Sequence, residues 1–362
     1  MKKKILSLVL VGGLLISAML TGCGSDTEKT GETTESEVGK VGCILGVGGL
    51  GDQSFNDLVF AGLEKAEAEL GVEFDYAEPT QVTDFEVMLR DMANTMEYDV
   101  IISVGFDATD GLTKVAPEFP EQNFAIIDNV IDLPNVVSYG AKEEEGAFLA
   151  GTVAGLMKKD AAAYGVEDNN QIGFLAAIDT PLLNKWNAGY QAGAKYVNPN
   201  VVCEVGYVAG DNPFGDTTTA KEIAISQYNR GADIMFHAAG GSGLGVFDAA
   251  AEYDFVALGC NSNQNTINPD HIVASVLKQV DTAAYNIAKA ACVDKNLAVG
   301  SAVTLGLADT GMNITFERSN LALSEADLAI VNEVKDKIVA GEIVVPAAVE
   351  EVDAFAKENT YK

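Results

Sequence analysis

Short apolar runs alternate with amphipathic segments of helical length from Val41 onward, and this alternation constrains the fold more than any other feature of the chain. Apolar residues in the longer segments recur at helical spacing, as in 54–70, which is followed by Gly71, a residue suited to close a helix. The first series predicts a short helix that ends at Ala116, helices at 54–70, 83–96 and 143–158, and strands at 41–47, 72–77, 99–105, 123–128 and 135–140.

A second series of the same kind begins near Gln171. It predicts strands at 172–178, 201–208, 232–239, 255–259 and 271–277, helices at 180–196, 217–231, 245–253 and 281–292, and a terminal helix at 324–340 followed by a strand at 342–347. Strands that alternate with helices form parallel sheets covered by helices. We therefore expect an α/β fold with two doubly wound parallel-sheet domains, and 362 residues suit two domains of about 150 residues each.

The expected domains are each built from two separate parts of the chain. We assign 41–141 plus 278–300 to the N-terminal domain and 142–277 plus 301–362 to the second domain, with a hinge of crossover strands between them. Ligands of doubly wound sheets bind where the strands end, and two facing domains make a cleft that can close. The residues that directly follow each strand are therefore the candidates for a binding site.

The first residues of the chain have the order of a bacterial lipoprotein signal. Three lysines precede an apolar stretch of 16 residues, which runs into Leu20-Thr21-Gly22-Cys23. This resembles a lipobox, so we expect a signal peptide at 1–22 and a lipid on Cys23; an uncleaved signal anchor is the alternative. The polar segment 23–40 predicts a flexible tether, and the protein is expected at the extracytoplasmic face of the cell membrane.

Charge and composition exclude several classes of function. The formal net charge is −30, which excludes binding to nucleic acid phosphates and to anionic lipid through the protein surface. Beyond Cys23 the cysteines are Cys43, Cys203, Cys260 and Cys292, which are too scattered for a disulfide framework. Only two histidines are present, so we expect no metal and no cofactor.

The strand-end loops contain aromatic, carboxylate and amide side chains, but no arginine. The chain has only Arg90, Arg230 and Arg318, and none of them follows a strand. Sites for phosphates and free carboxylates usually use an arginine fork, so a neutral ligand is expected. Aromatic rings that stack on a flat ring and carboxylates that accept from hydroxyls would suit a sugar or a nucleoside.

The stretch "ALGCNSNQNT" at 257–266 is unusual because four side-chain amides occur within five residues. They follow a predicted strand and are interpreted as groups that bind an uncharged polar ligand: Asn261, Asn263, Gln264 and Asn265. Other candidates have structural alternatives. Asp52 or Ser54 could cap a helix, Asp107 could be an N-cap with Asp110 in the first turn, and Trp186 could belong to the core.

Seven segments in order resemble the BMP (basic membrane protein) family of lipoproteins, in its purine nucleoside receptor group: "GDQSFNDLVFAGLEKA", "SVGFDATDG", "EEGAFLAGTVAG", "IGFLAAIDTPLLNKWNAGYQAGA", "FGDTTTAKEIA", "YNRGADIMFHAAGGSGLGV" and "ASVLKQV". The resemblance implies a type I periplasmic-binding-protein fold and a substrate-binding component of an ABC transporter. It also implies a ligand site formed by Asp52, Phe55, Asn56, Phe106, Asp110, Trp186, Phe214, Gly241, Asn261 and Lys278.

The resemblance further implies roles for single residues. Asn56 would face the base, Phe214 would stack on it, and Lys278 would contact the sugar. The family usually has Asp where this chain has Asn261, and that acid takes ribose hydroxyls. The implied function is capture of a neutral nucleoside, with a purine nucleoside favoured, for an ABC permease and ATPase by a monomer that is not an enzyme.

Three other functions stay open at the level of sequence. A sugar or furanose-type ligand would suit the same residue types, and a sensor that signals through a membrane partner would have the same pocket. An NAD-dependent enzyme is suggested by Gly46, Gly48 and Gly51, which fit a GxGxxG pattern. That pattern alone is weak evidence for a dinucleotide, and both histidines fall within predicted strands.

Overall fold

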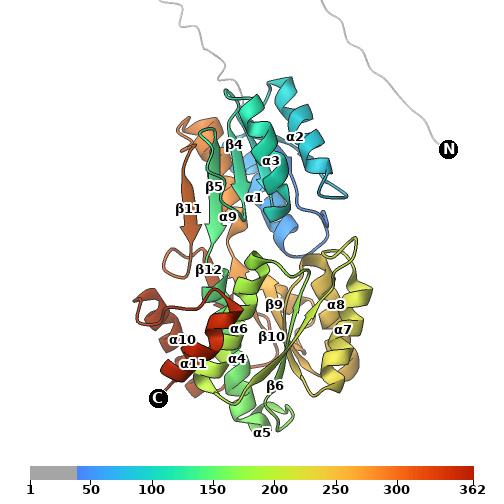
Figure 1. The fold of residues 1–362 in the computed structure, drawn as a ribbon, viewed down its shortest axis with the longest axis vertical. Coiled ribbons are helices and arrows are strands. Elements are labelled where there is room, and N and C mark those ends of the chain that lie inside the picture. The colour runs from blue at the N-terminus through green and yellow to red at the C-terminus, as the bar shows by residue number, and fades with distance from the viewer. Residues whose placement is uncertain (1–38) are drawn as a thin grey trace, which may run out of the picture. The chain divides into compact units, whose positions relative to one another are not determined.

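The structure of the protein is a computed structural model that describes residues 39–362. The predicted signal peptide, the lipidation site Cys23 and the tether up to residue 38 lie outside the described residues. Within the described part of the chain, none of the helices combines the length and the apolar character that a membrane crossing needs. Residues 39–362 form one compact unit with two lobes, each built on a six-stranded sheet (Figure 1).

The first sheet is entirely parallel, in the order β11-β5-β4-β3-β1-β2. Its strands are β1 (Lys40–Ile44), β2 (Glu73–Ala77), β3 (Val100–Val104), β4 (Phe124–Ile127), β5 (Val136–Ala141) and β11 (Ala302–Leu305). Side chains alternate between its two faces, as the pleat requires. Cys43 packs with α1 (Phe55–Leu70) and α9 (Val280–Ala288), whereas its neighbour Ile44 packs with α2 (Asp84–Thr95) and α3 (Thr109–Val115).

The second sheet has the order β12-β10-β9-β8-β6-β7, and only β12 is antiparallel to its neighbour. Its strands are β6 (Gln171–Ala176), β7 (Val202–Tyr207), β8 (Ile234–Ala238), β9 (Val256–Asn261), β10 (Ile272–Lys278) and β12 (Met312–Thr315). In Figure 1, α4 (Glu143–Lys159) and α6 (Pro181–Val197) lie on one side of this sheet. The other side is covered by α7 (Thr217–Asn229) and α8 (Leu244–Tyr253).

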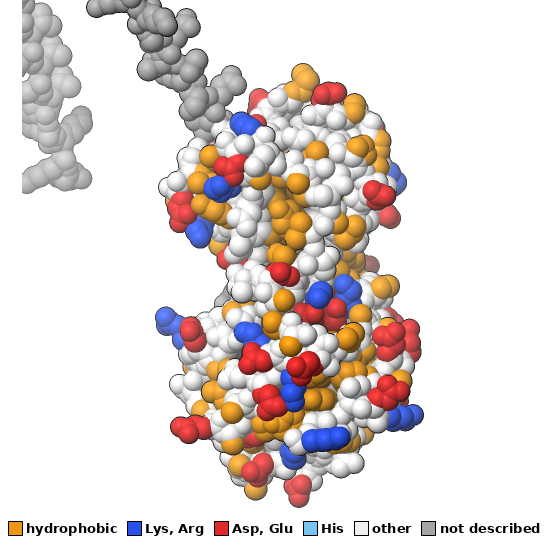
Figure 2. Space-filling model, turned by 90° about the vertical axis from the view of Figure 1, so that its left-hand side faces the viewer, with side chains coloured by type: hydrophobic (Ala, Val, Ile, Leu, Met, Phe, Trp, Pro, Cys, Tyr) orange, Lys and Arg blue, Asp and Glu red, His pale blue; other side chains and the backbone are white. Residues whose placement is uncertain are grey.

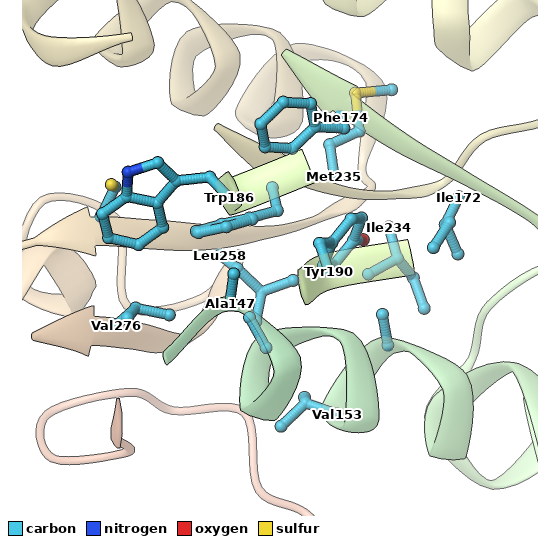
Figure 3. Close-up of a cluster of buried hydrophobic side chains, with 14 of the residues drawn as sticks. Ala147, Val153, Ile172, Phe174, Trp186, Tyr190, Ile234, Met235, Leu258 and Val276 are labelled. Carbon is cyan, nitrogen blue, oxygen red and sulfur yellow. The ribbon is translucent and has the colours of Figure 1, made fainter. Parts of the chain in front are cut away.

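The remaining helices are α5 (Ala161–Tyr164), α10 (Glu325–Val339) and α11 (Val352–Glu358). Helix α10 contacts α4, and α11 contacts α6. The buried faces of α4 and α6 meet the sheet in a core of aromatic and branched side chains, part of which is drawn in Figure 3. Trp186 and Tyr190 of α6 each pack against Phe236 of β8, with ring centroids 5.9 and 5.3 Å apart. This core fixes the position of α6, which carries a wall of the site described below.

Helices α4 and α6 approach each other closely because glycines lie where they meet. A Cβ atom at Gly193 would lie 1.9 Å from the carbonyl oxygen of Phe148, and one at Gly151 would lie 2.0 Å from that of Tyr190. Both obstacles are backbone atoms, which cannot move without shifting a whole helix. Gly151 and Gly155 of the segment "EEEGAFLAGTVAGLMK" are thus required by helix packing.

Three segments of the chain pass between the lobes, directly after β5, β10 and β11. They are hydrogen-bonded to one another through the backbone. The N–H of Lys142 donates to Leu305 at 2.9 Å, and the N–H of Gln279 donates to Gly311 at 3.0 Å. Figure 2 shows residues 39–362 narrowing between the two lobes, with basic and acidic side chains interspersed on the face shown.

The expected fold class is confirmed, with two differences in detail. The predicted strand at 342–347 is wrong, since this segment has no strand pairing, contains Pro346 and exposes 79% of Val344. The short edge strands β11 and β12 were not expected; β11 pairs with β5 in the first sheet, although 301–362 was assigned to the second domain. Four-residue edge strands bury little and therefore leave little hydrophobic pattern. The remaining domain boundaries stay a prediction.

Candidate functional site

A cavity lies between the carboxyl ends of the two sheets, where the loops of both lobes meet. Its empty space, counted with the open solvent at its mouth, is about 630 Å³. The residues predicted from sequence that line it are Asp52, Phe55, Asn56, Phe106, Trp186, Phe214, Gly241, Asn261 and Lys278. The strand-end loops thus converge on one place, as expected from doubly wound sheets.

Asp110 is not among the lining residues, and its neighbour Asp107 is. Asp110 lies exposed in the first turn of α3, the position that the structural alternative gave it. A short turn of 3-10 helix, Phe106–Ala108, precedes α3 and directs Asp107 to the cavity. The structural alternative of an N-cap does not hold for Asp107, whose side chain makes no capping hydrogen bond to α3.

Aromatic rings from both lobes line the cavity. Phe55 and Phe106 come from the first lobe, and Trp186 and Phe214 come from the second. The rings of Phe106 and Phe214 meet edge to face with centroids 6.2 Å apart. Trp186 is only 2% exposed and packs on Phe236, so it belongs to the core and to the cavity wall at once (Figure 3).

The start of α1 holds two polar side chains in fixed orientations. The Asp52 carboxylate accepts hydrogen bonds from the N–H groups of Ser54 at 2.8 Å and Asn56 at 2.9 Å, which is the capping role left open above. Burial raises the pKa of Asp52, although these bonds oppose the shift. The Asn56 Oδ1 atom accepts from the N–H of Gly46 at 2.8 Å, so the Asn56 amide nitrogen remains as a donor.

A group of buried charges lies at the cavity wall, and its central residue is Lys278. The Lys278 ammonium contacts Asp128 of the first lobe and lies 2.8 Å from Glu143 Oε1 at the start of α4. Glu143 also accepts from Lys185 of α6 at 3.2 Å. Lys278 further lies 5.5 Å from the centroid of the Phe55 ring. The lysine therefore contacts both lobes and is neutralised within the protein.

The pKa values in this group follow from burial and from the neighbouring charges. Burial would lower the pKa of Lys278, but Asp128 and Glu143 raise it, so the amine stays protonated. Burial raises the pKa of Asp128 to about 6, against the attraction of Lys278. Burial would also raise the pKa of Glu143, but Lys278 and Lys185 hold it below its ordinary value.

Of the four amide side chains in 261–265, only Asn261 lines the cavity, and the other three make hydrogen bonds within the protein. Gln264 and Asn265 are fully buried. The Gln264 Oε1 atom accepts from the N–H of Cys260 at 2.7 Å, and the Asn265 amide donates to the carbonyl of Glu317 at 2.9 Å. Asn263 caps a short helical turn by accepting from the N–H of Asn265.

Hydrogen bonds also join the two lobes across the mouth of the cavity, and we call this set the clasp. The carbonyl of Gln53 in the first lobe accepts from Ser262 Oγ at 2.6 Å and from the Gln264 amide at 3.2 Å. Ser54 Oγ donates to the carbonyl of Cys260 at 3.1 Å and accepts from the Asn261 amide at 2.9 Å. Asn261 thus takes part in lobe contact as well as lining the cavity.

His237 contacts the loop 261–265 through Gln264, and its burial should make the stability of the fold sensitive to acid. Its Nε2 atom lies 3.1 Å from Gln264 Oε1, and burial lowers its pKa to about 4. Between pH 6.5 and 4 the unfolded chain takes up a proton that the folded chain does not, so stability is lost as the pH falls through this window. The loss should reach about 3 kcal/mol.

The effect can be isolated by comparing urea unfolding of the parent and His237→Asn at pH 7.5 and 4.5. The stability advantage of the parent over the variant should shrink by about 2–3 kcal/mol at the lower pH. Phe247→Leu changes the ring packed on His237, 5.1 Å away, without a titrating group and serves as the control. An advantage of His237 that does not change with pH would contradict the assignment.

Comparison with known proteins assigns this chain and its fold to one class of proteins. The family described as "ABC transporter substrate-binding protein PnrA-like" matches residues 40–348. A solved ABC transporter solute-binding protein from Aeropyrum pernix K1 is similar with a TM-score of 0.80 and 29% identity, covering 90% of this chain and 100% of that one. The architecture is that of solute-binding proteins with the periplasmic-binding-protein fold.

Two relatives narrow the class further. An uncharacterized lipoprotein of Pyrococcus abyssi is 35% identical over 322 residues, which cover 86% of this chain and 77% of the relative. The "ABC transporter nucleoside-binding protein BmpA" of Lactococcus lactis is 26% identical over 370 residues, covering 96% and 100%. The chain belongs to the BMP family of ABC transporter substrate-binding proteins, which confirms the resemblance seen in the sequence.

Proposed function

We propose that this protein captures a neutral purine nucleoside between its two lobes and delivers it to an ABC importer. The observation that carries the proposal is the cavity itself: it combines aromatic walls from both lobes with carboxylates and amides, and its lysine is already neutralised. Binding and release require no covalent step. Membership of a substrate-binding family supports a small-molecule ligand and a transporter partner.

The charges favour an uncharged ligand over a nucleotide. A phosphate group needs a free cation or an arginine fork, and the lining residues contain neither. Lys278, the one cation among them, is held by Asp128 and Glu143. Asp52 and Asp107 add negative charge to the same cavity, so a phosphorylated ligand would be repelled.

The aromatic side chains favour a flat ring as part of that ligand. Phe55 and Phe106 face the cavity from one lobe and Phe214 from the other, so a base can be held between rings. The carboxylates and amides supply acceptors and donors for ribose hydroxyls and base edges. The name of the Lactococcus lactis relative supports a nucleoside as the ligand.

The proposal also covers the location of the protein at the membrane and its transporter partners. The lipobox predicts a lipid on Cys23 and an anchor at the extracytoplasmic face, and the Pyrococcus abyssi relative is itself named a lipoprotein. The tether 23–40 would let a monomer reach an ABC permease with its ATPase. A domain division at the three crossovers would let the lobes separate to release ligand.

Calorimetric titration of residues 24–362 tests the proposal with guanosine, inosine, adenosine, cytidine, uridine, adenosine 5′-monophosphate, ribose and galactose. We expect the purine nucleosides to bind most tightly and the monophosphate not to bind. Phe214→Ala should weaken nucleoside binding by about tenfold to hundredfold, since stacking on one ring contributes about 1–3 kcal/mol. Phe60→Ala removes a ring that packs on Phe74 outside the cavity and is the matched control.

If ribose or galactose binds and no nucleoside does, the ligand is a sugar and the nucleoside part of the proposal is wrong. Failure of every nucleoside and sugar to bind would overturn the proposal as a whole. A Phe214→Ala variant that binds as tightly as the parent would show that the ligand does not lie between the aromatic walls.

A further inference from the structure

One carboxylate in the cavity has no hydrogen-bond or ion-pair partner among the described residues. Asp107 lines the cavity and makes no hydrogen bond or ion pair with any of residues 39–362. Asp52, in contrast, accepts from backbone N–H groups, and Asp128 contacts Lys278. Burial, with a smaller contribution from the charge of Asp128, raises the pKa of Asp107 to about 6.

Among the described residues, no part of the fold uses this carboxylate. Asp107 is half-buried and has no protein donor, so its oxygens are open to the cavity and to a ligand. The backbone holds Asp107 at the cavity: Gly105 has a φ of 91°, which favours glycine, and the turn Phe106–Ala108 follows it directly. Partly desolvated groups that face a cleft are candidates for ligand contact.

Asp107 lies on the same side of the cavity as Asn56. Strands β1 and β3 are neighbours in the first sheet, and the loops that follow them approach closely at Gly46 and Gly105. Asn56 is oriented by the N–H of Gly46, which uses its oxygen and leaves its nitrogen as a donor. The first lobe therefore presents an acceptor, Asp107, and a donor, Asn56, to one ligand.

We propose that Asp107 and Asn56 select a 6-oxopurine base, that is guanine or hypoxanthine, over adenine. The Asp107 carboxylate accepts from N1–H, and from the exocyclic amine of guanine, while the Asn56 amide donates to the adjacent O6. Adenine has the opposite pattern, because its N1 is an acceptor and its 6-amino group is a donor. This inference rests on the proposed function and assigns Asp107 a role in base selectivity.

Selectivity against adenine is expected because bound adenine would leave the Asp107 carboxylate and the Asn56 amide without hydrogen-bond partners. Adenine would place its N1 lone pair against an ionised carboxylate and its amine against a donor amide. A site built to hydrogen-bond a group rejects ligands that lack it, because its buried polar atoms then stay unpaired. We expect guanosine and inosine to bind at least about tenfold more tightly than adenosine at pH 7.5.

The test is a set of calorimetric titrations with guanosine, inosine and adenosine on the parent, Asp107→Asn and Asp110→Asn. Asp107→Asn should weaken guanosine binding by about tenfold or more and bring the guanosine to adenosine ratio close to one, because an amide can donate to N1 of adenine. Asp110→Asn makes the same chemical change three residues away, outside the cavity, and should leave both affinities unchanged.

The outcomes separate this inference from the function on which it rests. Adenosine binding as tight as guanosine binding in the parent would overturn the selectivity role while leaving the nucleoside function intact. So would an Asp107→Asn variant that loses affinity for all three ligands by the same factor, which is the mark of a structural role. If no nucleoside binds the parent, the proposed function fails and the inference fails with it.

Discussion

Replacing Lys278 with methionine should lower the free energy of unfolding by about 3–5 kcal/mol at pH 8, the typical cost of breaking a buried ion pair. The substitution leaves two carboxylates, Asp128 and Glu143, buried beside each other without their shared cation. Both lie at the contact between the lobes, so ligand binding should fall as well. Chemical denaturation of the purified variant measures the first effect, and titration with nucleosides measures the second.

The pH dependence of this loss identifies its cause. Without Lys278, the pKa values of Asp128 and Glu143 should rise, because burial and mutual repulsion are then opposed only by Lys185, which contacts Glu143. Protonation at pH 5 removes that repulsion, so the variant should recover part of its stability there. Lys221→Met breaks an exposed ion pair with Glu252 and should cost less than about 1 kcal/mol. An equal loss for Lys278→Met at pH 5 and pH 8 would argue against uncompensated carboxylates.

Gly193→Ala should destabilise the second lobe by about 3 kcal/mol or more, although alanine is the better helix former. The added methyl group would lie 1.9 Å from a backbone carbonyl of α4, so the two helices would have to separate. Denaturant unfolding would measure the loss. Gly140→Ala is the control, since a Cβ atom there meets its nearest neighbour at an ordinary 3.7 Å. Similar stabilities for the two variants would show that α4 and α6 can separate at little cost.

Sequence reasoning located the strands that are buried and the loops that follow them, because burial leaves a strong periodic pattern. The positions after strands made Phe55, Trp186 and Phe214 candidates, and the family resemblance placed them at one site. Sequence reasoning missed the position of Asp107 in the cavity wall because a helical start and a short 3-10 turn look alike in sequence. This one turn decides which carboxylate lines the cavity: Asp107 does, and Asp110 does not.

The amides of 261–265 show a second limit of reasoning from sequence. Gln264 and Asn265 are buried amides that donate to backbone carbonyls of segments far away in the chain, at Gln53 and Glu317. Nothing near them in the sequence shows those partners. A cluster of amides after a strand therefore indicates a buried polar network as readily as a ligand site, and here only Asn261 reaches the cavity.

The clasp has a consequence for how such a protein can evolve. Its hydrogen bonds, such as those from Ser262 and Gln264 to the carbonyl of Gln53, join protein to protein and form only when the lobes are together. They therefore bias the equilibrium between open and closed forms by the same amount for every ligand. Substitutions at Ser262 and Gln264, which do not line the cavity, can therefore adjust overall binding strength while the choice among ligands is set inside the cavity. Asn261 is the exception, because it belongs to the clasp and also lines the cavity.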